Sequence, residues 1–421
     1  MGFNPMQSTR YGVAVMDGEQ PWLTIIGIGE DGWEGLSTEA RRAVESADLI
    51  FGGARHLAHV PMGEATRVAW QSPMASTVRE ILTTHRGQRR VSVLASGDPM
   101  LYGVGVTLTR ELSPTEFRVI PQVSGFSLAC ARMGWAAAAT TLVSLVNRPM
   151  EQLQRYLYPE QRVVIYSEDG ATPENVARML ADHGYGSSRL SVFDNLGGSS
   201  ERRRDGVARS WSTERCGDLN LIALACVADA GIKPLSLVPG LPEEAFETDG
   251  QLTKREVRAA TLARLAPLPG QRLWDVGAGS GTIGIEWMRA HPSCSCIAFE
   301  EREDRVVRIL ANAKRLGVPA LKVVTGTAPA TFKGLETPDA IFIGGGLITE
   351  HMFEECWDRL VSGGRLVANV VTVESEASLA ARHKQYGGEL VRILVARAEP
   401  VGGVLGWRHL MPITQWTAVK P

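Results

Sequence analysis

The chain has 421 residues, of which 44% are hydrophobic and 21% are charged, and its formal net charge is -2. This length predicts two or three domains, and the high apolar fraction with a near-zero net charge excludes a mainly disordered chain. The balance of 44 Lys plus Arg against 46 Asp plus Glu argues against a nucleic-acid partner, because such binding needs a basic surface.

The sequence shows no sign of export, membrane insertion or metal binding. Residues 1–21 predict a loose tail without the apolar core of a signal peptide. The most apolar stretch, Leu219–Ala228, is too short to cross a bilayer. The six cysteines form no C-x-x-C pair and the eight histidines are scattered, so neither a disulfide framework nor a metal site is predicted. We therefore expect a cytoplasmic protein with no membrane partner.

Strand and helix patterns alternate along the first half of the chain. An apolar strand starts at Leu23, followed by a glycine-containing turn and a helix whose N-cap is Ser37. Further strands are predicted over Val91–Ala95, Arg118–Pro121, Arg162–Tyr166, Leu190–Phe193 and Leu219–Cys226, and helices over Thr77–Arg86, Ser127–Met133 and Pro173–Asp182. This alternation predicts an α/β fold with a largely parallel sheet covered by helices.

Residues 231–250 contain three prolines and three glycines and interrupt this rhythm. We place the domain boundary there, with one domain over 22–232, a linker over 233–250 and a second domain over 251–421. The second domain repeats the α/β pattern, with strands over Arg272–Val276, Ser295–Phe299, Leu321–Thr325, Ala340–Ile343, Arg365–Val371, Glu389–Val395 and Gln415–Val419. The helix Asp304–Leu316 has one apolar stripe, and the last two strands predict an antiparallel pair joined by a Gly/Pro-rich loop.

The most specific local pattern is a glycine-rich turn between a strand and a helix. Asp275-Val-Gly277-Ala278-Gly279-Ser280-Gly281 directly follows the strand Arg272–Val276. Glycines let the backbone turn tightly and come close to a ligand beside a helix N-terminus. Glu300 ends the next strand, 23 residues after Gly277, where a carboxylate can accept both hydroxyls of a ribose. This context predicts a nucleotide-binding site.

Two ligands compete for this site. Gly279, Gly281 and Gly284 satisfy G-x-G-x-x-G, which suggests a dinucleotide and an NAD(P)-dependent reductase fused to a binding module. The D-V-G-x-G-x-G form instead resembles the first motif of class I S-adenosylmethionine-dependent methyltransferases, which have a Rossmann-like fold. An antiparallel pair that closes the sheet is a feature of those methyltransferases. We therefore favour S-adenosyl-L-methionine over a nicotinamide cofactor.

From about Gly240 onward the chain resembles the decarboxylating precorrin methyltransferases of cobalamin biosynthesis. The resemblance rests on Gly240-Leu-Pro-Glu-Glu-Ala-Phe, Leu252-Thr253-Lys254-Arg255-Glu256-Val257-Arg258, the glycine turn, Gly326-Thr-Ala328-Pro329 and Pro338-Asp339-Ala340-Ile-Phe-Ile-Gly344-Gly345. It implies that Thr253, Gly277, Ala278, Gly279, Ser280, Gly281, Glu300 and Ala328 contact the cofactor. Thr253 is also the predicted N-cap of a helix Lys254–Leu265, and the two roles are compatible.

The first half resembles the tetrapyrrole methylases, a class III methyltransferase α/β fold that also uses S-adenosylmethionine. The matching fragments are Ile26-Gly27-Ile28-Gly29, Ser96-Gly97-Asp98-Pro99-Met-Leu101-Tyr102-Gly103, Ile120-Pro121-Gln122-Val123-Ser124 and Asp194-Asn195-Leu196-Gly197. The resemblance implies cofactor contacts at Ser96, Gly97, Asp98, Leu101, Ser124, Gly125, Asn195, Leu196 and Gly197. Glu30 and Asp31 stand where the family usually has Pro-Gly, and Gln122 stands where it commonly has Gly. We leave the first loop out of the predicted cofactor site for this reason.

The two halves together resemble bifunctional precorrin methyltransferases. This resemblance implies methylation of the meso carbons C-5 and C-15 of the macrocycle and loss of carbon dioxide from the ring C acetate, with one cofactor site in each half. A reduced tetrapyrrole is an electron-rich enamine system, so its meso carbon can attack the sulfonium methyl group itself. The enzyme then supplies mainly positioning, and the macrocycle absorbs the electrons left by carbon dioxide.

A precorrin substrate carries several carboxylates, which predicts cationic contacts. The candidates are Lys254, Arg255 and Arg258, with Arg202, Arg203 and Arg204 as either a further set or a solvated loop. Asp339 is the predicted proton-handling group, placed beside the cofactor turn, and a structural role capping Gly344–Gly346 is its alternative. We expect the chain to form a homo-oligomer.

Overall fold

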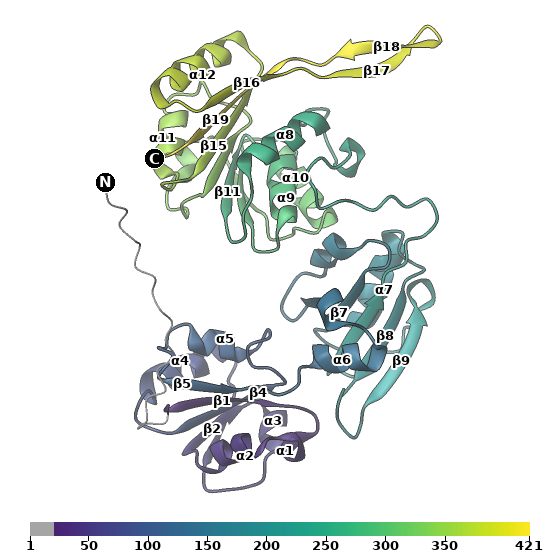
Figure 1. Cartoon of the computed structure of the whole chain (residues 1–421), viewed down its shortest axis with the longest axis vertical. Helices are drawn as coiled ribbons and strands as arrows, with labels where there is room; N and C mark the ends of the chain where they lie inside the picture. Colours follow the sequence, from purple (N-terminus) through teal and green to yellow (C-terminus); the bar gives the residue numbers. More distant parts are fainter. Residues whose placement is uncertain (1–20) are drawn as a thin grey trace, which may run out of the picture. The chain divides into compact units, whose positions relative to one another are not determined.

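A computed structural model describes residues 21–421, which form two compact units that do not follow chain order (Figure 1). The described part of the first unit contains residues 21–146, 162–177 and 189–225, and the second contains residues 147–161, 178–188 and 226–421. Almost all of the predicted tail, residues 1–21, lies outside the described range. Among the described helices, none combines the length and apolar character needed to cross a membrane.

The first unit contains a five-stranded, fully parallel sheet in the order β3-β2-β4-β1-β5. Its strands are β1 (Leu23–Ile28), β2 (Leu49–Gly52), β3 (Thr66–Ala69), β4 (Val91–Ser96) and β5 (Phe117–Ile120). Its helices are α1 (Gly32–Gly35), α2 (Thr38–Glu45), α3 (Ala54–Ala58), α4 (Met74–Thr84) and α5 (Val104–Thr109). Ser37 caps α2 as predicted, because its hydroxyl accepts from Ala40 N at 3.2 Å.

The second sheet of this unit has the order β6-β7-β10-β8-β9. It is built from β6 (Thr141–Ser144), β7 (Arg162–Tyr166), β8 (Arg189–Asp194), β9 (Arg202–Val207) and β10 (Asn220–Ala225), with the helices α6 (Gly125–Met133) and α7 (Thr172–Asp182). Our prediction of a largely parallel sheet is wrong here, because β10 lies between β7 and β8 and runs antiparallel to both. The connections from β8 to β9 and from β9 to β10 contain no α-helix, and such short connections permit antiparallel pairing.

The second unit contains a seven-stranded sheet in the order β13-β12-β11-β14-β15-β19-β16. Its strands are β11 (Arg272–Val276), β12 (Ser295–Glu300), β13 (Lys322–Thr325), β14 (Ala340–Ile343), β15 (Arg365–Val370), β16 (Glu389–Ile393) and β19 (Ile413–Val419). The helices are α8 (Arg255–Leu265), α9 (Thr282–Ala290), α10 (Glu303–Arg315), α11 (Met352–Arg359) and α12 (Val373–Tyr386). The first five strands in this order are parallel, and the predicted antiparallel pair is confirmed as β16 and β19.

A two-stranded ribbon replaces the loop predicted between β16 and β19. Its strands are β17 (Ala396–Val401) and β18 (Val404–His409), which pair only with each other. Figure 1 shows the ribbon extending away from the rest of the second unit. Sequence reasoning missed it because Gly402 and Gly403 were interpreted as part of one long loop, although they form the tight turn of the ribbon.

Part of the predicted linker belongs to the core of the second unit. Leu241 and Phe246 are buried in a cluster with Leu262 and Trp287. A segment from the first half of the chain also packs here, since Arg155 donates to the carbonyls of Met288 and Arg289 at 3.0 and 2.9 Å, at the end of α9. A cation that bonds the last carbonyls of a helix stabilises its C-terminus.

Candidate active sites

The first candidate site lies at the carboxyl edge of the parallel strands in the second unit. Strand β11 runs next to β12 on one side and β14 on the other, so the connections leave this point in opposite directions. Ligands of open α/β sheets bind at such a switch point, outside the carboxyl ends of the strands. The glycine turn follows β11, Glu300 ends β12, Ala328 follows β13 and Gly344 follows β14. All four predicted segments therefore meet at one edge.

The glycine turn needs glycine for two different reasons. At Gly277 (φ 72°) a β-carbon would lie 2.9 Å from the amide nitrogen of Gly345, so the loops after β11 and β14 touch without room for a side chain. At Gly279 (φ 60°) the nearest atom to such a β-carbon is the Gln251 carbonyl oxygen at 3.9 Å. Gly279 thus has a left-handed backbone and faces open space. A ligand can approach the backbone at this residue.

Asp275 joins the turn to the helix that follows it. Its carboxylate accepts from the Gly284 amide at 2.9 Å, and burial raises its pKa to about 7. A β-carbon at Gly284 would lie 2.6 Å from the Cys296 sulfur, so this glycine is required by helix–strand packing. The third glycine of the G-x-G-x-x-G pattern therefore has a packing explanation that needs no dinucleotide.

Glu300 presents a buried carboxylate beside the turn. It accepts from the Gly279 amide at 2.9 Å and from the Arg302 amide at 3.2 Å. An ionised carboxylate has about four lone-pair positions, so about two remain for a ligand. Two vicinal ribose hydroxyls match these two acceptor positions in number and in donor character. The residues present fit the adenosine end of S-adenosylmethionine.

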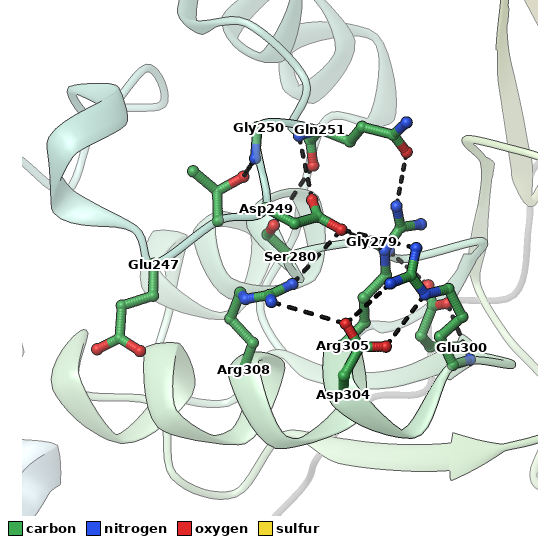
Figure 2. A network of polar contacts seen from close by, with 12 residues as sticks. Glu247, Asp249, Gly250, Gln251, Gly279, Ser280, Glu300, Asp304, Arg305 and Arg308 are labelled. Atoms are coloured by element: carbon green, nitrogen blue, oxygen red, sulfur yellow. Dashed lines mark hydrogen bonds and ion pairs between the residues drawn. The ribbon is translucent and has the colours of Figure 1, made fainter.

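A strap formed by residues 247–251 lies against the glycine turn, although the sequence analysis assigned most of it to a linker. Figure 2 shows Arg305 and Arg308 of α10 directed toward Asp249, and Arg305 also reaches Gln251. The Arg305 guanidinium donates to Asp249 at 2.9 Å and to the Gln251 side chain at 2.6 Å. The Ser280 hydroxyl donates to the Gln251 carbonyl at 3.4 Å. The spacing of the α10 arginines could have predicted an acidic partner.

Thr253 and Lys254 continue this strap into α8. The N-cap position of α8 is Lys254, so the prediction that Thr253 caps this helix is wrong. The Thr253 carbonyl accepts from Arg258 at 2.6 Å, which fixes the backbone two residues after Gln251. Lys254 is partly exposed and its ammonium group lies 3.2 Å from Glu243. The cofactor contact of Thr253 and the substrate contact of Lys254 stay predictions.

Arg258 is not placed to meet a substrate. Its side chain is fully buried, ion-paired with Glu286 at 2.6 Å and stacked over the Phe246 ring at 4.9 Å. It also donates to the Leu241 carbonyl. These contacts engage all three guanidinium nitrogens and the side chain has no exposed surface, so we remove Arg258 from the substrate-binding candidates. It ties the backbone of Leu241 and Thr253 to Glu286 in the core of the second unit instead.

Asp339 lies at the opposite edge of the sheet from the glycine turn. It precedes β14, and its carboxylate accepts from the backbone amide of Arg272, the first residue of β11, at 2.7 Å. Four to five residues of strand, roughly 15 Å at about 3.3 Å per residue, separate it from Gly277. Both roles predicted for Asp339, proton handling and capping of Gly344–Gly346, are therefore corrected. Asp339 instead links the start of β14 to the start of β11.

The second candidate site lies at the carboxyl edge of the parallel sheet in the first unit. Ser96 ends β4, and the next amide, of Gly97, donates at 3.0 Å to the carbonyl of Ile28, the last residue of β1. A β-carbon at Gly97 would lie 3.1 Å from the Ser124 α-carbon, in the segment after β5. The loop then turns tightly, because Asp98 accepts from Met100 N at 2.8 Å and its carbonyl accepts from Leu101 N at 3.0 Å.

Two further predicted segments meet this edge. Ser124 caps α6 by accepting from Ser127 N at 3.1 Å, and Gly125 is the first residue of that helix. The loop after β8 contributes Asn195, Leu196 and Gly197, and a β-carbon on the next residue, Gly198, would lie 2.8 Å from the Glu30 β-carbon. The structure therefore brings together all the predicted cofactor segments of the first half. It also brings in Glu30, which we had left out.

A polar cluster at this edge was missed by sequence reasoning. The Arg55 guanidinium donates to the Ser96 hydroxyl at 3.0 Å and to His56 Nε2 at 2.9 Å, and it forms an ion pair with Glu30. Because a guanidinium only donates, His56 Nε2 must accept, which makes this imidazole neutral. Burial lowers the pKa of His56 to about 4, in agreement with a neutral ring. Both residues follow β2, a short strand that was not predicted.

Two family models match the chain. The model described as "Tetrapyrrole (Corrin/Porphyrin) Methylases" matches residues 22–210, and the model described as "Precorrin methyltransferase domain" matches residues 244–420. The first of these regions contains the candidate site of the first unit, and the second contains the candidate site of the second unit. Every residue named above as a cofactor candidate lies within one of them. They follow the order expected from the sequence motifs.

Curated relatives match almost the whole chain. A precorrin-6Y C(5,15)-methyltransferase [decarboxylating] from Sinorhizobium sp is 48% identical over 403 residues, covering 95% of this chain and 97% of the relative. One of the same name from Mycobacterium tuberculosis is 43% identical, covering 94% and 100%. A cobalt-precorrin-7 C(5)-methyltransferase from Salmonella typhimurium is 30% identical over 182 residues, covering 43% of this chain and 88% of the relative. These similarities give no support to the NAD(P)-dependent reductase alternative.

Proposed function

Because this chain belongs to the family of decarboxylating precorrin-6Y C(5,15)-methyltransferases of cobalamin biosynthesis, we propose that each of its two candidate sites holds one S-adenosyl-L-methionine. The site in the first unit serves methylation at C-5 of precorrin-6Y. The site in the second unit serves methylation at C-15 and loss of carbon dioxide from the ring C acetate. The observation that carries this proposal is the presence of two separate glycine-lined edges, each at the carboxyl ends of parallel strands in a different sheet.

The relatives support a division of labour between two parts of the chain. The relative named for the C(5) methylation alone corresponds to 43% of this chain. If each activity belongs to its own part of the chain, a relative named for one activity should match only one part, as this one does. The two sheets that carry the sites share no strand, so each site can be damaged without the other.

The residues of both sites perform positioning more than chemistry. S-adenosylmethionine supplies an electrophilic methyl group, and the meso carbon of the electron-rich macrocycle attacks it, so that a carbon–carbon bond forms as the carbon–sulfur bond breaks. Glu300 and the amide groups of the glycine turn would hold the donor in the second unit. Ser96, Gly97 and the segments around Ser124 and Asn195 would hold it in the first. Such alignment can supply about 7–11 kcal/mol of barrier reduction.

Mass spectrometry of precorrin-6Y treated with the enzyme and methyl-labelled S-adenosylmethionine tests the proposal. We expect two added methyl groups and the loss of one carboxyl group. Titration with S-adenosylhomocysteine should give two binding sites per chain. A single added methyl group, or one binding site, contradicts the proposal of two donor sites.

We also propose that the chain associates with a second copy through the β17–β18 ribbon. Ala398 faces Trp407 and Pro400 faces Leu405 across the ribbon, which gives it one apolar face. Leu405 and Trp407 are 72% and 75% exposed. On the other face Arg397 donates to Glu243 and Glu256 of its own unit, at 2.6 and 2.7 Å. A two-stranded ribbon alone is marginally stable in water, so an identical apolar face is a fitting partner.

Sedimentation of the full chain tests this association. We expect an oligomer for the unmodified chain and a smaller species for Trp407→Glu. The matched control is Val373→Glu, at a similarly exposed apolar residue of α12. A monomeric unmodified chain, or an unchanged oligomer in Trp407→Glu, rules out the ribbon as the contact.

A further inference from the structure

A cavity of about 400 Å³ opens in the first unit where β8 ends. Its lining includes Asn195, Arg202, Arg204 and Arg215, together with Arg203, which lies between Arg202 and Arg204 on β9. Asn195 begins the loop that we assign to the donor site, so one residue borders both. The cavity volume lies at the small end of the range of about 300–1,000 Å³ for ligand pockets. It suits a side arm of a ligand better than a whole macrocycle.

The charge of this cavity is positive. The residues that line it include four arginines and the two carboxylates of Asp194 and Glu214. One of these arginines, Arg203, is engaged on the opposite face of β9, where it lies over the Phe193 ring and donates to Asp205 at 2.9 Å, so the other three carry the charge of the cavity. The Asp194 carboxylate is held in place by the Gly217 amide, which donates to it at 3.0 Å. Arg202 is exposed and forms no ion pair with any residue in the range 21–421 that the structure describes. The Arg202 guanidinium therefore lines the cavity without an ion-pair partner among the described residues.

The other arginines keep donors that a ligand can use. Arg204 donates to the Glu214 carbonyl at 3.0 Å and lies 3.7 Å from its carboxylate, and Arg215 donates to Asp218 at 2.6 Å. Each guanidinium has five N–H donors, so these contacts leave several unused. Exposed ion pairs contribute about 0–1 kcal/mol, and an incoming carboxylate can replace them readily.

The pairing of β9 places Arg202 and Arg204 on one face of the sheet. Strand β9 pairs with β8 so that Arg202 lies opposite Asp194 and Arg204 opposite Val192. Residues two apart on a strand point to the same face, so Arg202 and Arg204 act together. Strand β9 is also the edge of its sheet, and charged side chains on an edge strand prevent its pairing with other chains. Protection of this edge is therefore an alternative explanation for the arginines. That alternative predicts no effect on substrate binding.

We propose that this cavity binds a carboxylate-bearing side arm of the tetrapyrrole substrate and thereby anchors the macrocycle beside the donor loop of the first unit. The proposal rests on the proposed function, since it takes the substrate from it. Planar guanidinium groups bind carboxylates with two parallel hydrogen bonds, which fixes direction as well as distance. An arm held next to Asn195 limits how the ring can turn at the donor site.

Steady-state kinetics of Arg202→Gln, Arg204→Gln and the double variant test the proposal, with C-5 methylation counted by mass spectrometry. We expect KM for precorrin-6Y to rise about 10-fold for each single variant, from the loss of a charge-assisted hydrogen bond, while kcat stays the same. The Kd of S-adenosylhomocysteine should not change. Arg202→Lys should recover only part of the affinity, because an ammonium group lacks the paired donors.

Arg90→Gln is the matched control, since Arg90 is an exposed arginine ion-paired with Asp48 elsewhere in the first unit. Circular dichroism and thermal unfolding establish that each variant is folded. If the wild-type chain methylates C-5 and the folded double variant keeps the same KM, the cavity is not a substrate site and edge protection explains the arginines. If the wild-type chain does not methylate C-5 at all, the proposed function itself fails.

Discussion

The two candidate sites are built in different ways. In the second unit, the turn Gly277–Gly281 and the carboxylate of Glu300 come from two consecutive strands, and the segments after β13 and β14 join them at the edge of the same sheet. In the first unit, the site is assembled from loops after β1, β2, β4, β5 and β8, which belong to two sheets. A site made from one local motif is visible in the sequence. A site made from distant loops is visible only when the topology is known.

The sites also differ in their buried charge. The glycine turn of the second unit lies between two buried carboxylates, Asp275 and Glu300. The edge of the first unit instead has the Arg55 guanidinium and the neutral His56 ring next to Ser96. S-adenosylmethionine can be held by carboxylate acceptors for its ribose in the second unit and by the Arg55, His56 and Ser96 side chains in the first. The two sites should therefore respond to different substitutions.

The largest effect is expected for Gly279→Val. Valine is β-branched and disfavours the left-handed backbone at φ 60°, and its side chain would enter the open space beside Gln251. We expect C-15 methylation to fall roughly 100-fold or more, with C-5 methylation retained. Mass spectrometry that locates each labelled methyl group is the measurement.

The matched control for this variant is Gly270→Val. Gly270 has φ 84° and no neighbour within 4 Å of a built β-carbon, and it precedes β11 at the opposite edge of the sheet. The Gly270→Val substitution therefore carries a similar backbone penalty at a position away from the site. Loss of both methylations in Gly279→Val would show that the sites are not independent.

Gly97→Val should produce the reverse pattern. A β-carbon at Gly97 would lie 3.1 Å from the Ser124 α-carbon and 3.2 Å from the Val123 carbonyl oxygen, so valine forces two loops apart. We expect C-5 methylation to fall about 100-fold and C-15 methylation to persist. Gly87→Val is the control, because Gly87 has φ 67° and open space around it. Equal loss of both products in Gly97→Val would contradict the assignment of C-5 to the first unit.

Local patterns predicted the parts of this molecule that depend on neighbouring residues. The strands β7, β11 and β14 begin and end where expected, and the Ser37 cap is confirmed, because apolar runs and capping side chains act within a few residues. The strands β2 and β3 were missed although β14 is equally short, because β3 has the sequence Thr-Arg-Val-Ala without an apolar run and β2 has only three apolar residues before a glycine. Without β2, the sequence offered no reason to place Arg55 and His56 at the site.

Two errors could have been avoided from the sequence, and one could not. Arg258 lies three, four and seven residues before Thr261, Leu262 and Leu265, so helical spacing already placed it on the buried stripe of α8. Asp339 precedes its strand, whereas ligand sites follow strands. The position of β10 between β7 and β8 was not predictable, because it depends on pairing between residues far apart in the chain.

Glu300→Gln sharpens the comparison by removing one charge and little volume. The amide oxygen can still accept from Gly279 N, but the amide nitrogen replaces the oxygen that accepts from Arg302 N and offers the ribose a donor in place of an acceptor. We expect S-adenosylhomocysteine to bind the second-unit site about 10- to 30-fold more weakly, with the first-unit site unchanged. Isothermal titration should therefore resolve one strong and one weak site. The exposed neighbour Glu301 provides the control, Glu301→Gln, and equal weakening at both sites would refute the assignment.

The smallest effect on activity is expected for Asp275→Asn, which tests the buried charge instead. Burial raises the pKa of Asp275 to about 7, above its ordinary value of 3.8. Between these values the folded chain keeps a proton that the unfolded chain has released, so the free energy of unfolding should fall as pH rises, by at most about 1.4 kcal/mol per pH unit. Asparagine cannot titrate, so this part of the pH dependence should vanish. Urea unfolding from pH 5 to 7, followed by the fluorescence of the buried Trp274 and Trp287, measures it, and parallel pH profiles for the two chains would mean that Asp275 is ionised throughout.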